Sequence, residues 1–183
     1  MLTLKKIKMN KKGILFIAFF GLAFLFAQNA TTLSEFKSNI KQNKLEAKRS
    51  IKPYLYDGYK NTYFNYKTYK QTKEVEIYLF NNTDYRLAFN GKSSPKKVSV
   101  KIYNASKSDP NRILLKEIGD ISGDNILIST KSLNDAYKKQ KSKATRLKRV
   151  FINYEIPATP GANNKKPAIS DRGAVVLVLG YKN

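Results

Sequence analysis

The sequence contains no histidine, no cysteine and no tryptophan, and its 35 basic residues face only 13 acidic ones. The absence of histidine and cysteine excludes a Ser-His-Asp triad, a Cys-His pair and zinc sites built on these ligands. It also excludes disulfides and a lipid anchor attached to cysteine. The fold must therefore depend on its hydrophobic core, and catalysis would be limited to carboxylates, Ser-Lys pairs and oxygen-bound metals.

These remaining catalytic patterns each have a simpler interpretation. Ser-x-x-Lys spacings arise by chance in a lysine-rich chain, and the partner motifs of penicillin-binding enzymes are absent. Glu74 and Glu76 share the outward face of a predicted strand, where we expect them to pair with nearby lysines rather than to flank a bound sugar. The segment from Asp120 to Asn125 lacks the dense acidic spacing of a calcium loop and indicates a turn. We therefore predict a protein that is not an enzyme and has no cofactor or metal, with a carboxylate hydrolase as the weaker alternative.

Residues 1–27 have the three parts of a cleavable signal peptide. Lysines without any acid precede an apolar run from Gly13 to Phe26, and Ala27 stands before the expected cleavage site. The run is shorter than the ~20 residues of a membrane-spanning helix, so a retained anchor is the less favoured alternative. Cleavage would leave 156 residues (183 − 27) with a net charge of +17, because five of the 35 basic side chains are removed. We expect an exported protein, periplasmic or secreted, with no transmembrane span after cleavage.

Residues 28–53 are predicted to form a helical segment. The segment carries an apolar stripe at helical spacing, which is formed by Leu33, Phe36, Ile40, Ala47 and Ile51. Leu45 falls outside this stripe, and Pro53 ends the helical pattern. A helix from about 33 to 50 that packs on the rest of the chain follows from this pattern.

Residues 54–183 are predicted to form an all-β domain, because from Tyr54 onward apolar and polar residues alternate with period two. The runs 74–80 and 85–89 predict a hairpin, and residues 132–141 predict a short inserted helix. The run Ala174–Tyr181 is apolar almost throughout, which is typical of a central strand covered on both faces. We predict an antiparallel, jelly-roll-like sandwich of about eight strands with an N-terminal helix and a short inserted helix. Its strands are short for an outer-membrane barrel.

Half of the tyrosines lie in one short segment, where lysines interleave with them. Aromatic rings beside cations can stack on sugars or unpaired bases while the lysines bind phosphates or carboxylates. The alternative is an edge strand whose tyrosines lie over core and rim, since tyrosine is common in strands. The candidate binding residues of this segment are Tyr54, Tyr56, Tyr59, Lys60, Tyr63, Tyr66 and Lys67.

The densest basic run extends from Lys131 to Arg149, where eight basic residues accompany a single acid, Asp135. Such an excess of positive charge predicts attraction to polyanions. The alternative is a solvated, flexible insertion. The candidate binding residues of this run are Lys138, Lys139, Lys141, Lys143, Arg146 and Arg149.

The strand sequences Val100–Tyr103, Val150–Pro157 and Val175–Tyr181 resemble those of uncharacterised secreted β-sandwich proteins of Gram-negative bacteria. Their pattern is similar to the bacterial pre-peptidase C-terminal domain over roughly residues 74–181. The resemblance implies an accessory, non-catalytic sandwich and brings no functional residues with it.

Export, the sandwich pattern and the basic excess together favour a non-catalytic protein of the cell envelope. Its expected partner is an anionic surface or glycan, or a protein of an envelope complex, and peripheral contact with a membrane is compatible with this. The second hypothesis is an extracellular nucleic-acid-binding protein that uses the tyrosine-lysine segment.

Overall fold

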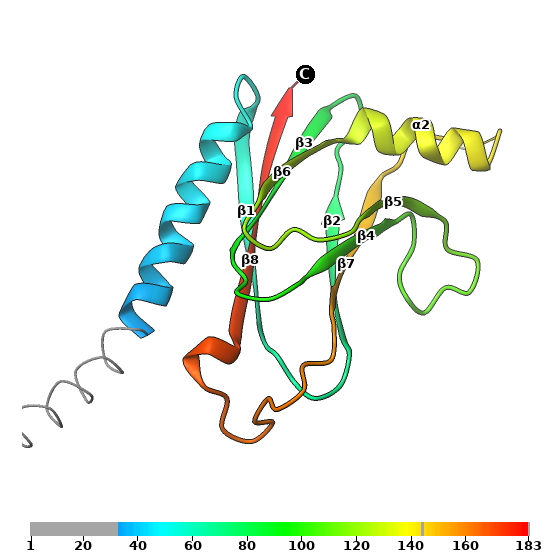
Figure 1. Cartoon of the computed structure of the whole chain (residues 1–183). Coiled ribbons are helices and arrows are strands. Elements are labelled where there is room, and N and C mark those ends of the chain that lie inside the picture. The colour runs from blue at the N-terminus through cyan, green and yellow to red at the C-terminus, as the bar shows by residue number, and fades with distance from the viewer. Residues whose placement is uncertain (1–32, 144, 183) are drawn as a thin grey trace, which may run out of the picture. The chain divides into compact units, whose positions relative to one another are not determined.

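The computed structural model describes residues 33–143 and 145–182, so the predicted signal peptide lies outside the described residues. The chain divides into two compact units, residues 1–37 and 38–183. Of the first unit the described part is the beginning of a helix that spans residues 33–50, as the apolar stripe predicts. The second unit contains the rest of that helix and the β domain (Figure 1). In the described residues, no helix has the length and apolar character needed to cross a membrane.

The described residues of the second unit form two antiparallel four-stranded sheets packed as a sandwich, as predicted. Sheet A has the strand order β1-β8-β3-β6, with β1 Leu55–Asn65, β8 Arg172–Lys182, β3 Asp84–Ser93 and β6 Asn125–Ser129. Sheet B has the order β2-β7-β4-β5, with β2 Gln71–Tyr78, β7 Arg149–Ile156, β4 Ser99–Tyr103 and β5 Leu114–Ile118. Strands consecutive in sequence take corresponding places in the two sheets, which is the arrangement of a jelly roll. The helix α2 (Thr130–Gln140) and the 3-10 turn η1 (Ile169–Asp171) complete the unit.

The predicted hairpin of residues 74–80 and 85–89 is wrong. Within the described chain β2 pairs with β7 in sheet B, whereas β3 pairs with β6 and β8 in sheet A. The turn after Phe80 therefore carries the chain from one sheet to the other. Alternation of apolar residues is the same for two strands that pair side by side and for two that face each other across a core, so the pattern did not distinguish these arrangements.

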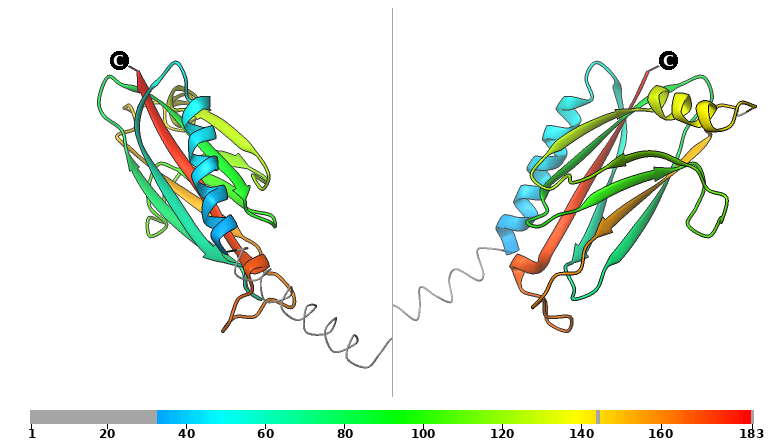
Figure 2. Two further views of the ribbon diagram at one scale, coloured as in Figure 1. Left: turned by 90° about the vertical axis from the view of Figure 1, so that its left-hand side faces the viewer. Right: turned by 45° about the vertical axis from the view of Figure 1, so that its right-hand side comes forward.

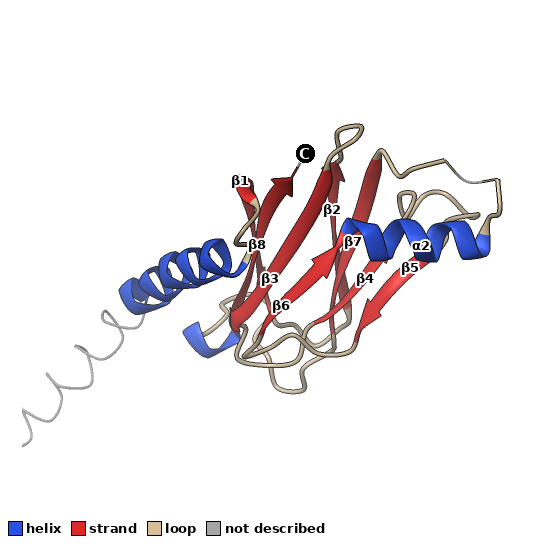
Figure 3. Cartoon of the chain, turned by 90° about the horizontal axis from the view of Figure 1, so that it is seen from above, coloured by secondary structure: helices blue, strands red, loops and turns tan. Residues whose placement is uncertain are grey.

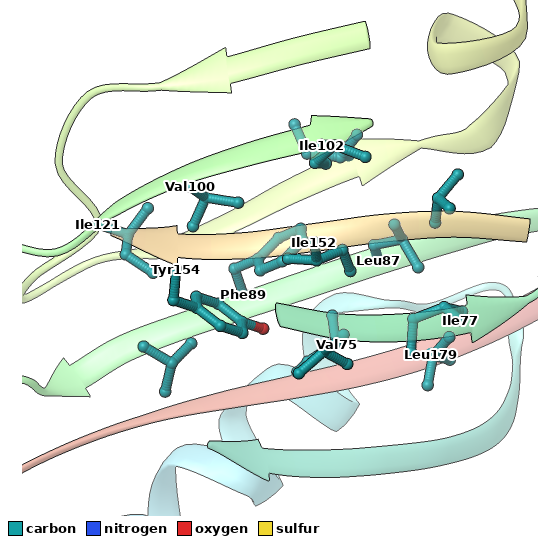
Figure 4. Packing of buried hydrophobic residues seen from close by; sticks show 14 of the residues in the cluster. Val75, Ile77, Leu87, Phe89, Val100, Ile102, Ile121, Ile152, Tyr154 and Leu179 are labelled. Atoms are coloured by element: carbon teal, nitrogen blue, oxygen red, sulfur yellow. The ribbon is translucent and has the colours of Figure 1, made fainter. Parts of the chain in front are cut away.

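The main core lies between the two sheets and is built from the inward positions of both (Figure 4). Val75 and Ile77 of β2, Leu87 and Phe89 of β3, and Ile152 of β7 contribute to it, and all five side chains are buried. The Phe89 ring meets the edge of the Tyr154 ring, with the centroids 6.4 Å apart and an angle of 67° between the planes. The two sheets thus bury aromatic and branched side chains against each other, which is the main stabilising contribution expected for a domain without disulfides.

A second buried layer lies on the outer face of sheet A, beneath residues 38–50 of the N-terminal helix (Figure 2). Ile40 and Ala47 of the helix are buried, and so are Val176 and Val178 on the outward side of β8. Strand β8 lies between β1 and β3 and is covered on both faces. The prediction of a central strand that is covered on both faces is therefore confirmed. The sequence of β8 is apolar almost throughout because the side chains on both of its faces are buried.

Polar contacts fix the helix against strand β3. The amide of buried Asn43 lies 2.7 Å from Ser93 Oγ. The Glu46 carboxylate accepts hydrogen bonds from Lys92 at 2.6 Å and from the Asn90 amide at 3.1 Å. The Lys92 hydrogen bond is the main reason why the pKa of Glu46 lies below its ordinary value. Glu46 on this flank of the helix is therefore paired within the fold, whereas the opposite flank, which faces β1, carries lysines.

Candidate binding surface

Strand β1 is an edge strand of sheet A in the described structure, where it pairs with β8. Its register places Tyr59, Asn61 and Tyr63 on the outer face, opposite Val178, Val176 and Ala174 of β8. A bulge between Tyr56 and Gly58 inserts one residue, so Tyr56 faces the same side as Tyr59 although the two are three positions apart. Tyr56, Tyr59 and Tyr63 are 38%, 46% and 58% exposed. The edge strand thus presents a row of accessible phenol rings beside the N-terminal helix.

Lysines of the helix lie over these rings. The Nζ atom of Lys44 is 3.7 Å from the centroid of the Tyr59 ring, and that of Lys48 is 4.5 Å from the centroid of the Tyr56 ring. Lys44 and Lys48 are one helical turn apart and therefore project from the same flank, which Lys41 extends by a further turn. A cation that lies over an aromatic face is attracted to the ring by about 0.5–1 kcal/mol at exposed sites. None of these three lysines has an ion pair within residues 33–143 and 145–182, so their charge is not neutralised there.

Three buried polar atoms on the same face of sheet A have no hydrogen-bond partner among the described residues. Two of them, Asn61 Oδ1 and Arg172 Nε, lie on β1 and at the start of β8, and the third, Asn125 Oδ1, lies on β6 at the other edge of the sheet. The Asn61 amide nitrogen donates to the Tyr63 hydroxyl at 3.3 Å, so the oxygen alone is unpaired. Arg172 is paired with Asn65 two positions beyond Tyr63. Buried polar atoms without partners are uncommon and call for an explanation, such as a ligand or water. The Tyr/Lys surface consists of Lys41, Lys44, Lys48, Tyr56, Tyr59, Asn61, Tyr63 and Arg172.

The other predicted residues of the tyrosine-lysine segment lie elsewhere. Lys60 is exposed on the opposite side of β1, the side of Thr62 and Phe64, where a charge at a sheet edge discourages pairing with another strand. The Tyr54 ring is half-buried with the Arg86 guanidinium 4.3 Å from its centroid. Lys67 Nζ donates to the Tyr69 hydroxyl at 2.8 Å, in the connection after β1.

Tyr66 is the clearest correction to the predicted site, because its side chain is fully buried and cannot stack on a ligand. Its hydroxyl donates to the carbonyl of Lys96, and its ring meets the edge of Phe64 at a centroid distance of 5.4 Å. Alternation explains the error, since Phe64 and Tyr66 fall on the core side of the chain whereas Tyr59 and Tyr63 fall on the outer side. The segment is both an edge strand and the source of the exposed tyrosines.

Burial raises the pKa of Tyr66 to about 12. The unfolded chain would release this proton near pH 10, whereas the folded chain retains it, so stability is complete below about pH 10 and falls as the pH rises toward about 12. We expect the loss of urea resistance over this range to be smaller in a Tyr66→Phe variant than in the wild type. Parallel pH dependences of the two proteins would show that Tyr66 is not a source of the alkaline instability.

The basic run from Lys131 to Arg149 separates into two groups. Arg146 forms an ion pair with Asp84 at 2.7 Å, and Arg149 forms one with Glu76 at 3.0 Å, so both arginines hold the fold together. The other candidates are exposed, lie on the last turn of α2 and the segment that follows it, and form no ion pair within residues 33–143 and 145–182. This α2 lysine cluster consists of Lys138, Lys139, Lys141 and Lys143.

The acids of sheet B are paired on its outer face. Glu74 lies 3.7 Å from Arg112 and accepts the Lys107 backbone N–H at 2.9 Å, and Glu155 lies 3.4 Å from Lys101. Together with the Glu76–Arg149 pair, these contacts balance the charge of that face. The two predicted strand glutamates do face outward, but their charged partners are arginines rather than lysines. The positive excess of the molecule is therefore concentrated away from this face.

A pocket of about 330 Å³ lies between the outer face of sheet B and the loop after β4. Glu76, Asp109, Arg149 and Phe151 line it together with Ala105 and Ser106. Because Arg149 already neutralises Glu76, the pocket does not offer two unpaired carboxylates for acid-base catalysis on a sugar.

The predicted turn at Asp120 has a structural role. Its carboxylate Oδ1 accepts the backbone N–H of Val98 at 3.2 Å and that of Ser122 at 2.9 Å. Burial opposes ionisation of Asp120, but these hydrogen bonds and one from the Ser122 hydroxyl hold its pKa below the ordinary value. The carboxylate thus organises the loop before β6.

No protein-family model matches the chain, and no curated protein is similar to it. The resemblance to secreted sandwich proteins therefore stays a prediction, and the geometry of the surface is the basis for its function. Sequence patterns indicated the tyrosines of β1, but Lys44, Lys48 and Arg172 were missed. Their i, i+4 spacing beside the buried stripe marks the two lysines as one flank of the helix, although it does not say which strand that flank meets.

Proposed function

We propose that this protein is a non-catalytic binding protein of the bacterial cell envelope that holds an acidic polysaccharide on its Tyr/Lys surface. The observation that carries this proposal is the position of Lys44 and Lys48 over the exposed rings of Tyr59 and Tyr56. Exposed rings offer flat apolar faces for sugar rings, and ammonium groups beside them attract carboxylates. Export through the predicted signal peptide is part of the proposal, since it would bring the protein to such polymers.

Nearby polar groups suit the same ligand. The unpaired Asn61 oxygen and Arg172 Nε are buried, so a bridging water would link them to the hydroxyls and carboxylates of a bound sugar. Acids of the fold would not compete for the lysines, because Glu46 is held by Lys92 on the other flank of the helix and the sheet B glutamates are paired with their own cations. A polymer with both hydroxyls and negative charges matches this combination better than a purely charged surface does.

Reversing three charges should weaken binding without changing the fold. In a Lys41→Glu, Lys44→Glu, Lys48→Glu variant we expect affinity for soluble polygalacturonate to fall about tenfold or more, since each exposed charge pair contributes up to about 1 kcal/mol. Binding of the wild type should also weaken as salt is added. Microscale thermophoresis across a salt series measures both effects, and circular dichroism confirms that the variant is folded.

The control replaces Lys73, Lys116 and Lys165 by glutamate, which changes the net charge equally at exposed positions outside the Tyr/Lys surface. Its affinity should stay within about twofold of the wild type at moderate salt, where distant charges are screened. Equal losses in the two triple variants would mean that net charge, rather than this surface, attracts the polymer. Failure of the wild type to bind at low salt would overturn the proposed function.

Stacking is tested by a Tyr59→Ala, Tyr63→Ala variant, with Tyr78→Ala as its control because Tyr78 is 66% exposed on β2. Aromatic contacts worth about 0.5–1.5 kcal/mol predict an affinity for polygalacturonate lower by about twofold to tenfold in the double variant. Tighter binding of single-stranded DNA than of the polyuronate, with the same dependence on Tyr59 and Tyr63, would favour a nucleic-acid partner and contradict the polysaccharide.

A further inference from the structure

The helix α2 is fixed to the sandwich through its first half and its last turn. Leu133 is fully buried, and the Thr130 hydroxyl accepts the backbone N–H of Tyr85 at 2.9 Å and donates to its carbonyl at 3.2 Å. The Asn134 side chain accepts the N–H of Leu147 at 2.8 Å and ties the helix to the segment before β7. The Gln140 amide donates to the carbonyl of Leu114 at 2.8 Å, which holds the last turn against β5. The helix therefore presents its end at a defined place instead of forming a flexible insertion.

The lysines at the C-terminal end of α2 carry positive charge that no acid of the described residues neutralises. The acids that could neutralise this part of the chain are used by its arginines, Asp84 by Arg146 and Glu76 by Arg149. The α2 lysine cluster has no ion pair within the described residues. Asp135, the one acid of the helix, lies three and four positions before Lys138 and Lys139, but it forms no ion pair with either of them there. Lys138 and Lys139 on the last turn of the helix, with Lys141 and Lys143 directly after it, make a second cationic surface of four exposed ammonium groups.

The two cationic surfaces belong to opposite edges of the sandwich. In sheet A the order β1-β8-β3-β6 puts β1 at one edge and β6 at the other. The Tyr/Lys surface includes β1, whereas α2 follows β6 directly and contacts β3, β5 and β6. Figures 1 and 3 show β1 and α2 on opposite sides of the sheets. A packed β-sandwich separates them, so neither surface extends the other.

We infer that the protein is bivalent: the Tyr/Lys surface and the α2 lysine cluster bind different segments of acidic polymer, and the protein bridges polymer chains. This inference rests on the proposed function, because the first surface must bind such a polymer. Two sites on one rigid body convert a second binding event into a local one, which strengthens attachment to a dense polymer layer without any new contact. The first surface adds stacking and hydrogen bonding to charge, whereas the second contributes charge alone.

Light scattering from mixtures of the protein with polygalacturonate tests the inference. Wild-type protein should raise the scattering to a maximum at an intermediate protein-to-polymer ratio and lower it again when excess protein occupies the polymer separately. A Lys138→Glu, Lys139→Glu, Lys141→Glu, Lys143→Glu variant should scatter at least fivefold less at that maximum. Its affinity for a short galacturonate oligomer, which occupies one surface at a time, should stay within threefold of the wild type.

The matched control replaces Lys73, Lys116, Lys165 and Lys166 by glutamate, which removes the same charge at exposed positions outside both surfaces. Undiminished scattering by the α2 variant, or an equal loss in the control, would overturn bridging through the α2 lysine cluster. In either case, oligomer binding that still depends on Lys44 and Lys48 would leave the proposed function standing. Loss of oligomer binding in the wild type itself would overturn both.

Discussion

Replacing Phe89 by alanine should lower the free energy of unfolding by about 3–5 kcal/mol, because a large buried ring is removed and a cavity remains. The Phe89 side chain is fully buried between the sheets and meets the edge of Tyr154 (Figure 4). A domain of this size is stable by only about 5–15 kcal/mol, and there is no cysteine to add a disulfide. Urea denaturation followed by circular dichroism measures the loss as a shift of the midpoint.

Phe80→Ala is the matched control, since the substitution is the same and the Phe80 side chain is 70% exposed just after β2. Its cost should remain within about 0.5 kcal/mol, as is usual for surface positions. If the two variants lost similar stability, the packing of β3 against β7 across the sandwich would be incorrect. If Phe89→Ala were folded but its unfolding transition became broad, the core would have lost its unique packing rather than only its volume.

Local sequence patterns were sufficient to predict the strands but not their partners. The period-two alternation around Val75 and Leu87 places both residues in a core, and the continuous apolar run of β8 marks it as central. Which strands pair depends on contacts between segments distant in sequence, such as β1 with β8, and these leave no mark on either strand alone. The wrong hairpin of β2 and β3 follows from this limit.

Of the candidate site, the sequence predicted the tyrosines but not the lysines that lie over them. Tyrosines of β1 stand out in the sequence, and alternation can divide Tyr63 from Tyr66 once the strand register is known. The lysines that cover them come from the helix, and their position depends on how the helix crosses sheet A. The two arginines of the basic run look like the neighbouring lysines in sequence, but Arg146 and Arg149 meet Asp84 and Glu76 only in the folded chain. Charge in a sequence therefore gives an upper limit to charge available for binding.

The position of the helix depends on Gly180, which lies on the outward side of β8 beneath the turn that joins the helix to β1. A Cβ atom built there would lie 2.8 Å from Ile51 Cδ1 and 2.9 Å from Tyr54 Cβ, closer than side-chain carbons normally approach. A valine at this position would displace that turn, and the helix end that carries Lys48 would move with it. Gly180 thus links the packing of the fold to the arrangement of the Tyr/Lys surface.

We therefore expect Gly180→Val to lower the free energy of unfolding by about 1–3 kcal/mol and to weaken polygalacturonate binding at least as much as reversal of the three helix lysines does. Gly119→Val is the control, because a Cβ at Gly119 meets nothing within 4 Å. Urea denaturation and the binding assay are measured on the same samples, at temperatures where the variant is folded. If Gly180→Val destabilised the protein while binding stayed at the wild-type level, the Tyr/Lys surface would not depend on the docked helix, and the lysines above Tyr56 and Tyr59 would not be the contacts that hold the polymer.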